Sequence, residues 1–390
     1  MTTIIAFILI LGPLITIHEL GHFIAARYVG IRVERFSIGM PPRFITITSV
    51  DNGYLFRLFF FKRNLEGKIK WRPVLEKNLS LVKKIGSKTE YVIALLPLGG
   101  YVKMAGMIDE NMDMELNNND DEFMSKSLWA KILVLSAGVI MNTALAIIIF
   151  TLMGYYQGSP EVRNEPIISE VIEGMPAYNS GILSGDLITE VDGEKISTWD
   201  ELSSIIHKNP EKNISLIIKR KNELLNYNLI TAINVIPSQD KIDTVGVIGI
   251  RPQVDFRNIT INEAFILGLE RTMASFGMIF QSLGLIGSGS ASVSDLGGPI
   301  MIAQLAGQTF EAGIFPFLTF MALLSINLAF LNIMPIPGLD GGHILIHLIE
   351  GIIRKPISLK TRMMIQQAGM IFLLIIMVTV ISNDFIRLFN

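Results

Sequence analysis

The sequence predicts a multi-pass α-helical membrane protein of about four transmembrane helices, with a β-rich domain inserted in the chain. Half of the 390 residues are hydrophobic and only 17% are charged, whereas soluble domains carry about 25% charged residues. Several apolar runs are long enough to cross a bilayer. Between the second and third of these runs, residues 165–250 change to short segments that are typical of strands.

The four transmembrane helices follow from the apolar runs, because a helix needs about 20 mostly apolar residues to cross a bilayer. We expect them at residues 1–29, 129–155, 314–342 and 363–382. The first run has no positive residue before it and no small-residue cleavage site, so we expect a retained helix and not a signal peptide. A weaker apolar run lies at residues 264–286, within the connecting segment 258–313. Because it carries Glu270 and Arg271 centrally, it is expected to be interfacial or packed against the bundle.

Lysine and arginine gather in two segments, residues 30–128 and the short stretch that follows Asp340. Cytoplasmic loops carry such an excess, so both segments are expected in the cytoplasm and both termini outside it. Residues 50–88 are basic and apolar, which fits either a segment on the cytoplasmic leaflet or an ordinary loop. Residues 111–122 are acidic and rich in asparagine, and predict a solvated loop.

Residues 165–250 contain short apolar segments separated by turn signals. The expected strands are IISEVI, DLITEV, ISLIIK and YNLITA. One helix is expected over residues 198–207, with Thr198 or Asp200 at its cap. A stretch of about 85 residues with this pattern is the size of a small β-barrel module, and the topology prediction places it outside the cytoplasm.

The composition excludes several kinds of site. The chain has no cysteine, which rules out disulfides, thiolate metal ligands and a cysteine nucleophile. Its net charge is −2, and nothing in the charge pattern indicates a nucleic-acid partner.

The first apolar run contains the sequence HELGH, which places His18 and His22 at positions i and i+4 on one helix face. Two imidazoles at that spacing can bind one zinc ion, and Glu19 beside them can act as general base on a water that the metal activates. The alternative is chance occurrence of a short motif. Two histidines and a glutamate are costly inside an apolar helix, however, and such residues indicate a functional site.

A zinc site of this type needs a third protein ligand. The strongest candidate is Asp340 in NIMPIPGLDGGH, at the far end of the third apolar run. The predicted topology brings Asp340 and His18 to the same side of the membrane, since both helices start outside. A helix cap is the alternative role for Asp340. His343 and His347 also stand at i and i+4, but no glutamate follows the first of them, so we expect packing or supporting residues and not a second metal pair.

These segments resemble the site-2 protease family of intramembrane zinc metalloproteases, and most closely its bacterial branch of regulator-of-sigma-E type. The segments that carry the resemblance are HELGHFIAARYVGIRVERFSIG, YVIALLPLGGYVKMAG, SVSDLGGPIMIAQLAG and NIMPIPGLDGGHI, in the family's order. The combination of HExxH in a first membrane helix with a distant NxxPxPxLDGGH is highly specific. The segment EGMPAYNSGILSGDLITEVDG resembles the binding-loop region of a PDZ domain, which assigns residues 165–250 to that fold.

The resemblance implies a zinc metalloendopeptidase of the bacterial inner membrane that cleaves a transmembrane segment of its substrate. It implies His18, His22 and Asp340 as Zn²⁺ ligands and Glu19 as catalytic base. Asn332 is implied as a substrate-contacting residue, and Pro335 and Pro337 as substrate-site residues that break the third helix. The implied partners are single-span membrane proteins, such as an anti-sigma factor or a signal-peptide remnant, and peptide termini at the PDZ domain.

Three departures from the family pattern are visible. The usual GFGK-like turn before the re-entrant β segment is replaced by residues 39–43, GMPPR. Residues 50–88 look like an insertion, and one PDZ-like module is present where the regulator-of-sigma-E type has two. Two other classes of function are considered. A catalytically dead relative that escorts membrane proteins would lack a ligand or the base, yet all four residues are present. A transporter would favour inverted repeats, and none is evident.

Overall fold

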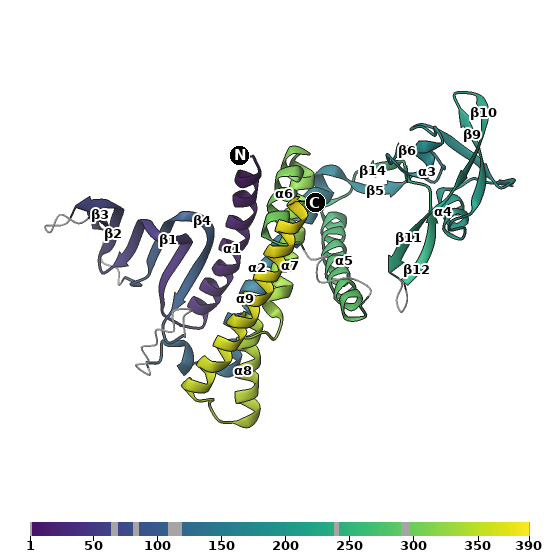
Figure 1. The fold of residues 1–390 in the computed structure, drawn as a ribbon. Helices are drawn as coiled ribbons and strands as arrows, with labels where there is room; N and C mark the ends of the chain where they lie inside the picture. The colour runs from purple at the N-terminus through teal and green to yellow at the C-terminus, as the bar shows by residue number, and fades with distance from the viewer. Residues whose placement is uncertain are drawn as a thin grey trace. The chain divides into compact units, whose positions relative to one another are not determined.

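The computed structural model describes residues 2–63, 69–80, 86–107, 119–237, 242–289 and 297–389. The chain divides into two compact units (Figure 1). The first comprises residues 1–151 and 268–390, and the second comprises residues 152–267. We describe each by itself.

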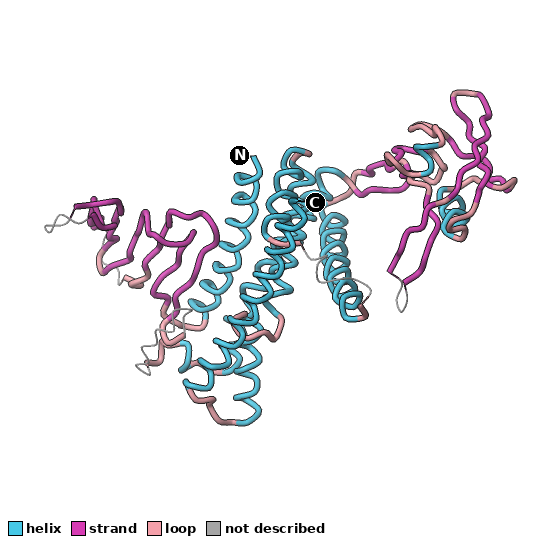
Figure 2. The backbone as a smooth tube through the Cα atoms, viewed as in Figure 1, coloured by secondary structure: helices cyan, strands magenta, loops and turns pink. Residues whose placement is uncertain are grey.

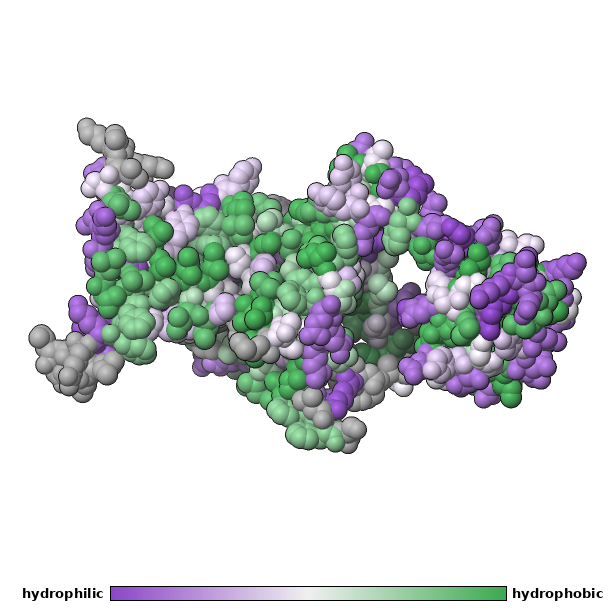
Figure 3. Space-filling model, turned by 90° about the horizontal axis from the view of Figure 1, so that it is seen from above, coloured by the Kyte–Doolittle hydropathy of each residue, from purple (hydrophilic) through white to green (hydrophobic). Residues whose placement is uncertain are grey.

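The first unit is built on long helices. Their bounds are α1 Thr2–Tyr28, α2 Leu128–Gln157, α5 Ile261–Gly287, α6 Pro299–Glu311, α7 Ile314–Ile333, α8 Asp340–Ile353 and α9 Leu359–Phe389, and a short 3₁₀ helix, η1, spans Phe123–Ser125. Among the described residues, four helices are long and apolar enough to cross a membrane: α1, α2, α7 and α9. This confirms the predicted fold class. Hydrophobic residues are prominent on the part of this unit that is visible in Figure 3.

Close helix packing in this unit depends on small residues. A Cβ atom on Gly21 of α1 would collide with the carbonyl of Ala137 in α2, and one on Gly307 of α6 would meet Thr3 of α1. A buried carboxylate in one of the apolar helices has backbone partners. Asp384 of α9 accepts hydrogen bonds from the first backbone N–H groups of α6, at Gly298, Ile300 and Met301, where the helix dipole favours a negative charge.

The weaker apolar run at residues 264–286, which was expected to be either interfacial or packed against the bundle, forms most of α5. Gly268 of α5 approaches the backbone of Ile147 and Thr151 in α2. Phe280 of α5 lies edge-on to Phe330 of α7, with ring centroids 5.1 Å apart. Its described contacts therefore favour the packed alternative.

A four-stranded antiparallel sheet lies between α1 and α2 in the sequence. Its strands are β1 Val33–Val50, β2 Gly53–Arg63, β3 Ile69–Ser80 and β4 Glu90–Met104, in the order β3-β2-β1-β4. β4 packs along α1 (Figure 1). Ser37 of β1 pairs with both Tyr101 and Val92 of β4, so the first half of β1 lies between the two halves of β4. Residues 50–88, the predicted insertion, supply β2 and β3.

The second unit is rich in strands (Figure 2). Its elements are β5 Ser159–Val162, β6 Ile168–Val171, α3 Pro176–Asn179, β7 Leu187–Val191, β8 Glu194–Lys195, α4 Trp199–His207, β9 Asn213–Arg220, β10 Glu223–Ile230, β11 Ala232–Pro237, β12 Ile242–Val247, β13 Ile250–Pro252 and β14 Val254–Arg257. Strands occur at all four predicted strand segments. The largest sheet has the order β10-β9-β7-β8.

A helix cap, a buried apolar core and an ion pair stabilise this second unit. Thr198 caps α4 through a capping box with Glu201, which confirms the first of the two predicted caps. Ile188, Leu216 and Ile218 are fully buried at its core. Arg220 donates two hydrogen bonds to Asp186, whose side chain is 1% exposed. Removing one partner of such a pair leaves a buried charge and typically costs about 3–5 kcal/mol.

Of the predicted acidic loop at residues 111–122, residues 111–118 lie outside the described part of the chain, and residues 119–122 are described.

Candidate metal centre

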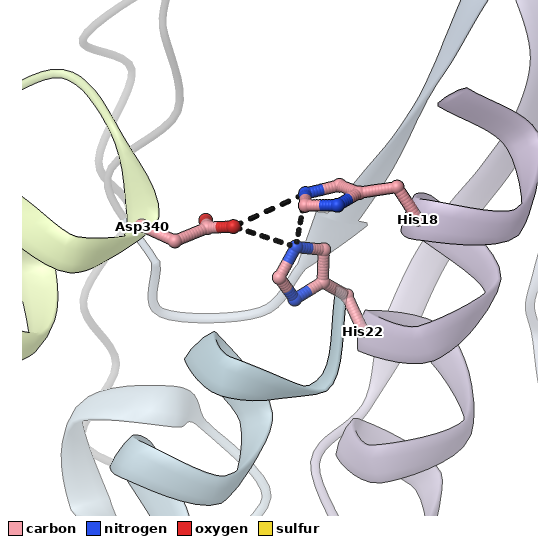
Figure 4. A group of neighbouring side chains, drawn as sticks. All are labelled: His18, His22 and Asp340. Atoms are coloured by element: carbon pink, nitrogen blue, oxygen red, sulfur yellow. Dashed lines mark hydrogen bonds and ion pairs between the residues drawn. The ribbon is translucent and has the colours of Figure 1, made fainter. Parts of the chain in front are cut away.

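Helix α1 supplies two imidazoles to one buried point. Residues four apart lie on the same helix face, so His18 and His22 project together toward α2 and α8 (Figure 4). Their Nε2 atoms lie 3.1 Å apart, and both side chains are buried. The i, i+4 spacing on α1 therefore brings two imidazole nitrogens together as possible ligands of one metal ion.

Asp340 supplies an oxygen to the same point. It is the first residue of α8, after the short connection that follows α7. Its Oδ2 atom lies 3.1 Å from His18 Nε2 and 3.3 Å from His22 Nε2 (Figure 4). Within the described chain, these three residues are the one group of three or more His, Asp or Glu side chains whose donor atoms converge to within 4.8 Å.

The donor set fits a zinc ion in chemistry and in spacing. Neighbouring ligand atoms of a tetrahedral zinc site stand about 3.3 Å apart when each is about 2.0–2.1 Å from the metal. The three measured separations are 3.1, 3.1 and 3.3 Å. Asp340 Oδ2 is also buried without a hydrogen-bond partner, and a buried acceptor in that state is costly unless something else occupies its lone pairs. Three protein ligands leave the fourth position for water or substrate.

The opposite nitrogen of each imidazole determines which nitrogen is free for a metal. His22 Nδ1 lies 2.8 Å from the carbonyl oxygen of Val134, so Nδ1 carries the proton and donates it, which leaves Nε2 as the electron-pair donor. His18 Nδ1 faces the side-chain amide of Asn142 in α2, with 3.3 Å to Nδ2. Asn142 Oδ1 is buried without a partner. Exchanging the amide oxygen and nitrogen places Oδ1 where it accepts a hydrogen bond from His18 Nδ1, which gives His18 the same tautomer as His22.

Two residues of α2 contribute to this centre and were not predicted from sequence. Asn142 contacts His18, and its backbone carbonyl accepts a hydrogen bond from Ser325 of α7, 2.8 Å away. Gly138 lies one turn earlier, directly against both imidazoles. A signal was present for Asn142, since a polar side chain inside an apolar span is a functional candidate by default. Gly138 had no such signal.

Glu19 lies beside the histidines and lines a cavity of about 860 Å³. All three donor residues line the same cavity, together with Asn332, His343 and Gln366. Val102 of β4 lines the cavity together with Glu19. The cavity volume is typical of a binding site, so the carboxylate and the donor set face a space that can hold several residues of a chain.

The predicted substrate-site residues divide into two groups. Asn332 lines the cavity, in the last turn of α7. Pro335 and Pro337 are not among its lining residues. They lie in the connection after α7, where the backbone of Pro337 packs against Gly369 of α9. Their position fits the helix-ending part of the prediction and not direct contact with a substrate.

His343 and His347 do not form a second pair of metal ligands. His343 lines the cavity. His347 points elsewhere, with Nδ1 2.9 Å from Glu350 and its ring 5.6 Å from that of Phe123. This agrees with the prediction of packing or supporting residues.

A comparison with protein families decides the classification. The family model described as Peptidase family M50 matches residues 6–67 and 75–376. The chain belongs to this family. The predicted site-2 protease membership is therefore confirmed, and with it the predicted class of enzyme, an intramembrane zinc metalloprotease.

Curated relatives cover almost the whole of this M50 protease. A putative zinc metalloprotease from Clostridium perfringens is 33% identical over 98% of both chains. Zinc metalloprotease RasP from Oceanobacillus iheyensis is 31% identical over 100% of both chains. The regulator of sigma-W protease RasP from Bacillus subtilis is 30% identical over 99% of both. Among solved structures, a PDZ domain of an SdrC-like protein from Listeria innocua is 26% identical and covers 23% of this chain and 93% of that one, with a TM-score of 0.19.

The gap between the two M50 matches, residues 68–74, falls at the start of β3. This part of the hairpin reaches the cavity, because Phe59 of β2 and Trp71 of β3 both line it. Trp71 Nε1 donates a 2.6 Å hydrogen bond to the carbonyl of Arg43, and the Arg43 guanidinium lies over the Phe59 ring. Arg43 is also paired with Glu90 at 3.0 Å. Phe59 and Trp71 therefore form an aromatic wall of this cavity.

Proposed function

We propose that this M50 protease hydrolyses a peptide bond within a transmembrane segment of a single-span membrane protein. In this proposal His18, His22 and Asp340 hold a catalytic zinc ion. Glu19 is the general base. The observation that carries the proposal is the convergence of the three donor atoms, at the spacing of tetrahedral zinc ligands, beside Glu19 in a large cavity.

The substrate segment has to unwind before it can be cleaved, because the carbonyls of an intact helix are already hydrogen-bonded. Asn332 is placed to hold the unwound strand through its side-chain amide. Glu19 accepts the proton of the attacking water and returns it to the departing amine, which is the exchange expected of one carboxylate acting as base and then as acid. A bound zinc ion supplies the polarisation of the scissile carbonyl and the activation of water.

Residues around the proposed zinc ligands orient the imidazoles and provide polar groups near the site. Val134 and Asn142 orient the two imidazoles from behind. Arg35 and Arg43 line the cavity, and both are paired with Glu90, at 2.6 Å and 3.0 Å. Polar groups near the site suit this reaction, since hydrolysis consumes water that lipid does not supply.

We further propose that the site lies toward the cytoplasmic side of the bacterial inner membrane and that both termini are extracytoplasmic. The distribution of lysine and arginine supports this orientation. The β-rich unit would then be an extracytoplasmic PDZ-type domain that receives peptide termini by adding a strand to a sheet edge. The name of the Bacillus subtilis relative, a regulator of sigma-W protease, favours an anti-sigma factor as one substrate; a signal-peptide remnant is the other class we expect.

The test uses the purified full-length chain with a single-span model substrate in bilayers. Glu19→Gln is expected to keep one zinc per chain and to lose cleavage. His22→Phe is expected to lose both. Cleavage at the parent rate by Glu19→Gln would remove the assigned base, and zinc retained at full occupancy by His22→Phe would remove the assigned ligand set.

A further inference from the structure

A second cavity lies away from the metal centre, at the opposite end of α8. Its volume is about 270 Å³. It is formed by the start of α2, the last turn of α8 and the turn that follows α8, and its apolar lining includes Met124 and Leu128. A Cβ atom on Gly351 would stand 2.6 Å from Leu128 Cδ2. The cavity therefore lies where the last turn of α8 meets the start of α2.

Three cations line this cavity: Lys131, Arg354 and Lys355. Within the described chain, none of them forms an ion pair within 4.0 Å. Arg354 and Lys355 are exposed and Lys131 is half-buried. Like charges held together without a partner repel one another, so an anion among them would be favourable.

The acid in the cavity wall does not neutralise these cations. Glu350 Oε1 accepts a 2.6 Å hydrogen bond from Arg362 and a 2.7 Å bond from the backbone N–H of Ile357. Its Oε2 atom lies 2.9 Å from His347 Nδ1. Arg362 is itself buried, with a side chain that is 5% exposed. Glu350 and Arg362 thus form an internal neutral pair, and the three remaining cations give the cavity its positive charge.

The cavity lies at the level of a membrane boundary. Lys131 is in the first turn of α2 and Arg362 is in the first turn of α9, both membrane-crossing helices. Trp129, next to the cavity in the sequence, is 76% exposed, and Ile352 of the last turn of α8 is 81% exposed. Exposed aromatic and apolar side chains at the end of a span are typical of the lipid–water interface, where phospholipid phosphates also lie.

We infer that this cavity binds a phosphate ester, and that its position assigns it to the head group of an anionic phospholipid. Lys131, Arg354 and Lys355 contact the phosphate oxygens, and Met124 and Leu128 contact the glycerol end of the acyl chains. Lysine is a common ligand of phosphate, and arginine binds it through two parallel N–H groups. Inorganic phosphate offers the same chemistry without the acyl chains, and the experiment separates the two sources.

Occupation of this cavity would act on α8 as a whole. The cavity borders the last turn of the 14-residue helix whose first residue is Asp340. A rigid helix of this length spans about 20 Å, so fixing one end restricts the other. An effect on proteolysis rests on the proposed function; binding of the lipid does not.

The experiment titrates the full-length, delipidated protein in neutral detergent, at constant ionic strength, and reads thermal stability and native mass spectra. The probes are phosphatidylglycerol, phosphatidylcholine and inorganic phosphate. The test variant combines Lys131→Gln, Arg354→Gln and Lys355→Gln. The matched control combines Arg27→Gln, Lys126→Gln and Lys360→Gln. Arg27 and Lys360 are exposed, Lys126 is half-buried like Lys131, and none of the three lines the cavity.

We expect one retained phosphatidylglycerol per chain, little protection by phosphatidylcholine, and no comparable protection by inorganic phosphate. The cavity variant should weaken phosphatidylglycerol binding on the order of a hundredfold, and Lys355→Gln alone about fivefold, because each removed cation takes away one charge-assisted contact to the phosphate. The control should bind as the parent does. A cooperative thermal unfolding transition without lipid shows that a variant is folded. If the triple variant is not folded, Lys355→Gln alone tests the inference.

Two results would overturn the inference. Equal losses in the cavity variant and the control would show general attraction of a basic face to anionic lipid and no site. Protection by inorganic phosphate without any by phosphatidylglycerol would overturn the lipid assignment.

Discussion

Gly138 of α2 and His18 of α1 stand so close that a Cβ atom built on Gly138 would lie 2.6 Å from His18 Nε2, and 2.7 Å from His22 Nε2. Carbon and nitrogen atoms that are not bonded do not approach to this distance without displacement. The absence of a side chain at Gly138 is therefore a condition for the present positions of both Nε2 atoms. The backbone of α2 at Gly138 therefore packs directly against the metal centre that residues of α1 and α8 form.

Replacing Gly138 with alanine should consequently displace the imidazoles. We expect Gly138→Ala to lower zinc occupancy and to reduce cleavage by at least about tenfold, because ligand positions a few tenths of an ångström off lose metal affinity and catalytic geometry together. Zinc per chain is measured by metal analysis after dialysis. Gly277→Ala in α5 is the control, since nothing lies within 4 Å of its added Cβ. Full zinc and full activity in Gly138→Ala would contradict the role of this close approach.

Asn142 is expected to set the tautomer and orientation of His18. Asn142→Ala removes the partner of His18 Nδ1 and should weaken zinc binding by about 10–100-fold, the usual effect of losing the outer partner of a metal-bound histidine. The affinity is measured by competition with a chromophoric chelator.

The conservative variant makes this prediction specific. Asn142→Asp keeps an oxygen acceptor at the same distance and should retain most of the zinc affinity. If Asn142→Asp and Asn142→Ala lost zinc equally, the residue would be acting through packing with Ser325 and α7 and not through His18.

The candidate ligands could be predicted from sequence because metal binding restricts both residue type and spacing. His18 and His22 need only helical periodicity to converge. Asp340 is more than 300 residues away, and its motif indicated it before any fold was known. Gly138 and Asn142 were not predicted, because their roles depend on which face of α2 meets α1. An almost uniformly apolar helix does not encode that face in its hydrophobic pattern.

The β2–β3 hairpin was also beyond sequence reasoning. Its apolar residues run consecutively through LFFF in β2, which fits neither strict alternation nor a helical face. Its place beside β1 depends on pairing across the whole sheet, and the pairing of β2 with β3 contains a register shift between Leu58 and Phe59. The capped helix α4, by contrast, was predicted correctly because its signal is local.

His347 should make the stability of this protein depend on pH. Burial, together with the nearby cations Arg362 and Lys131, lowers the pKa of His347 to about 4, although Glu350 acts in the opposite direction. The unfolded chain takes up a proton near pH 6.5 and the folded chain does so only near pH 4. Between these values the unfolded state holds more protons, so stability falls as the pH is lowered from about 6.5 to about 4.

The variant His347→Gln should remove this part of the pH dependence while it keeps a polar partner for Glu350. The slope of unfolding free energy should become shallower by up to about 1.4 kcal/mol per pH unit over that interval. Thermal unfolding of the parent and variant in mild detergent, compared pH by pH, measures the difference, and acid-induced loss of zinc is common to both. Parallel curves for the two proteins would show that His347 has an ordinary pKa.

Trp71 is expected to affect substrate selection and not the metal centre. It stands in the cavity wall beside Phe59, held by its hydrogen bond to the Arg43 carbonyl, and it is not in the donor set. Under the proposed function, Trp71→Ala opens this wall and should lower kcat/KM for a substrate with a large apolar residue near the cleavage site by about 10–100-fold. Zinc content should stay at one per chain.

Trp71→Phe distinguishes two roles of this side chain, because phenylalanine keeps an aromatic ring but cannot donate the hydrogen bond to Arg43. If the ring forms the wall, Trp71→Phe should keep most of kcat/KM; if the hydrogen bond to Arg43 holds the hairpin in place, Trp71→Phe should behave as Trp71→Ala does. Leu79→Ala, at an exposed β3 position that does not line the cavity, is the control. Unchanged kcat/KM in Trp71→Ala for both large and small residues at the cleavage site would mean that the substrate does not reach the aromatic wall. The hairpin would then be a neighbour of the M50 site and not a part of it.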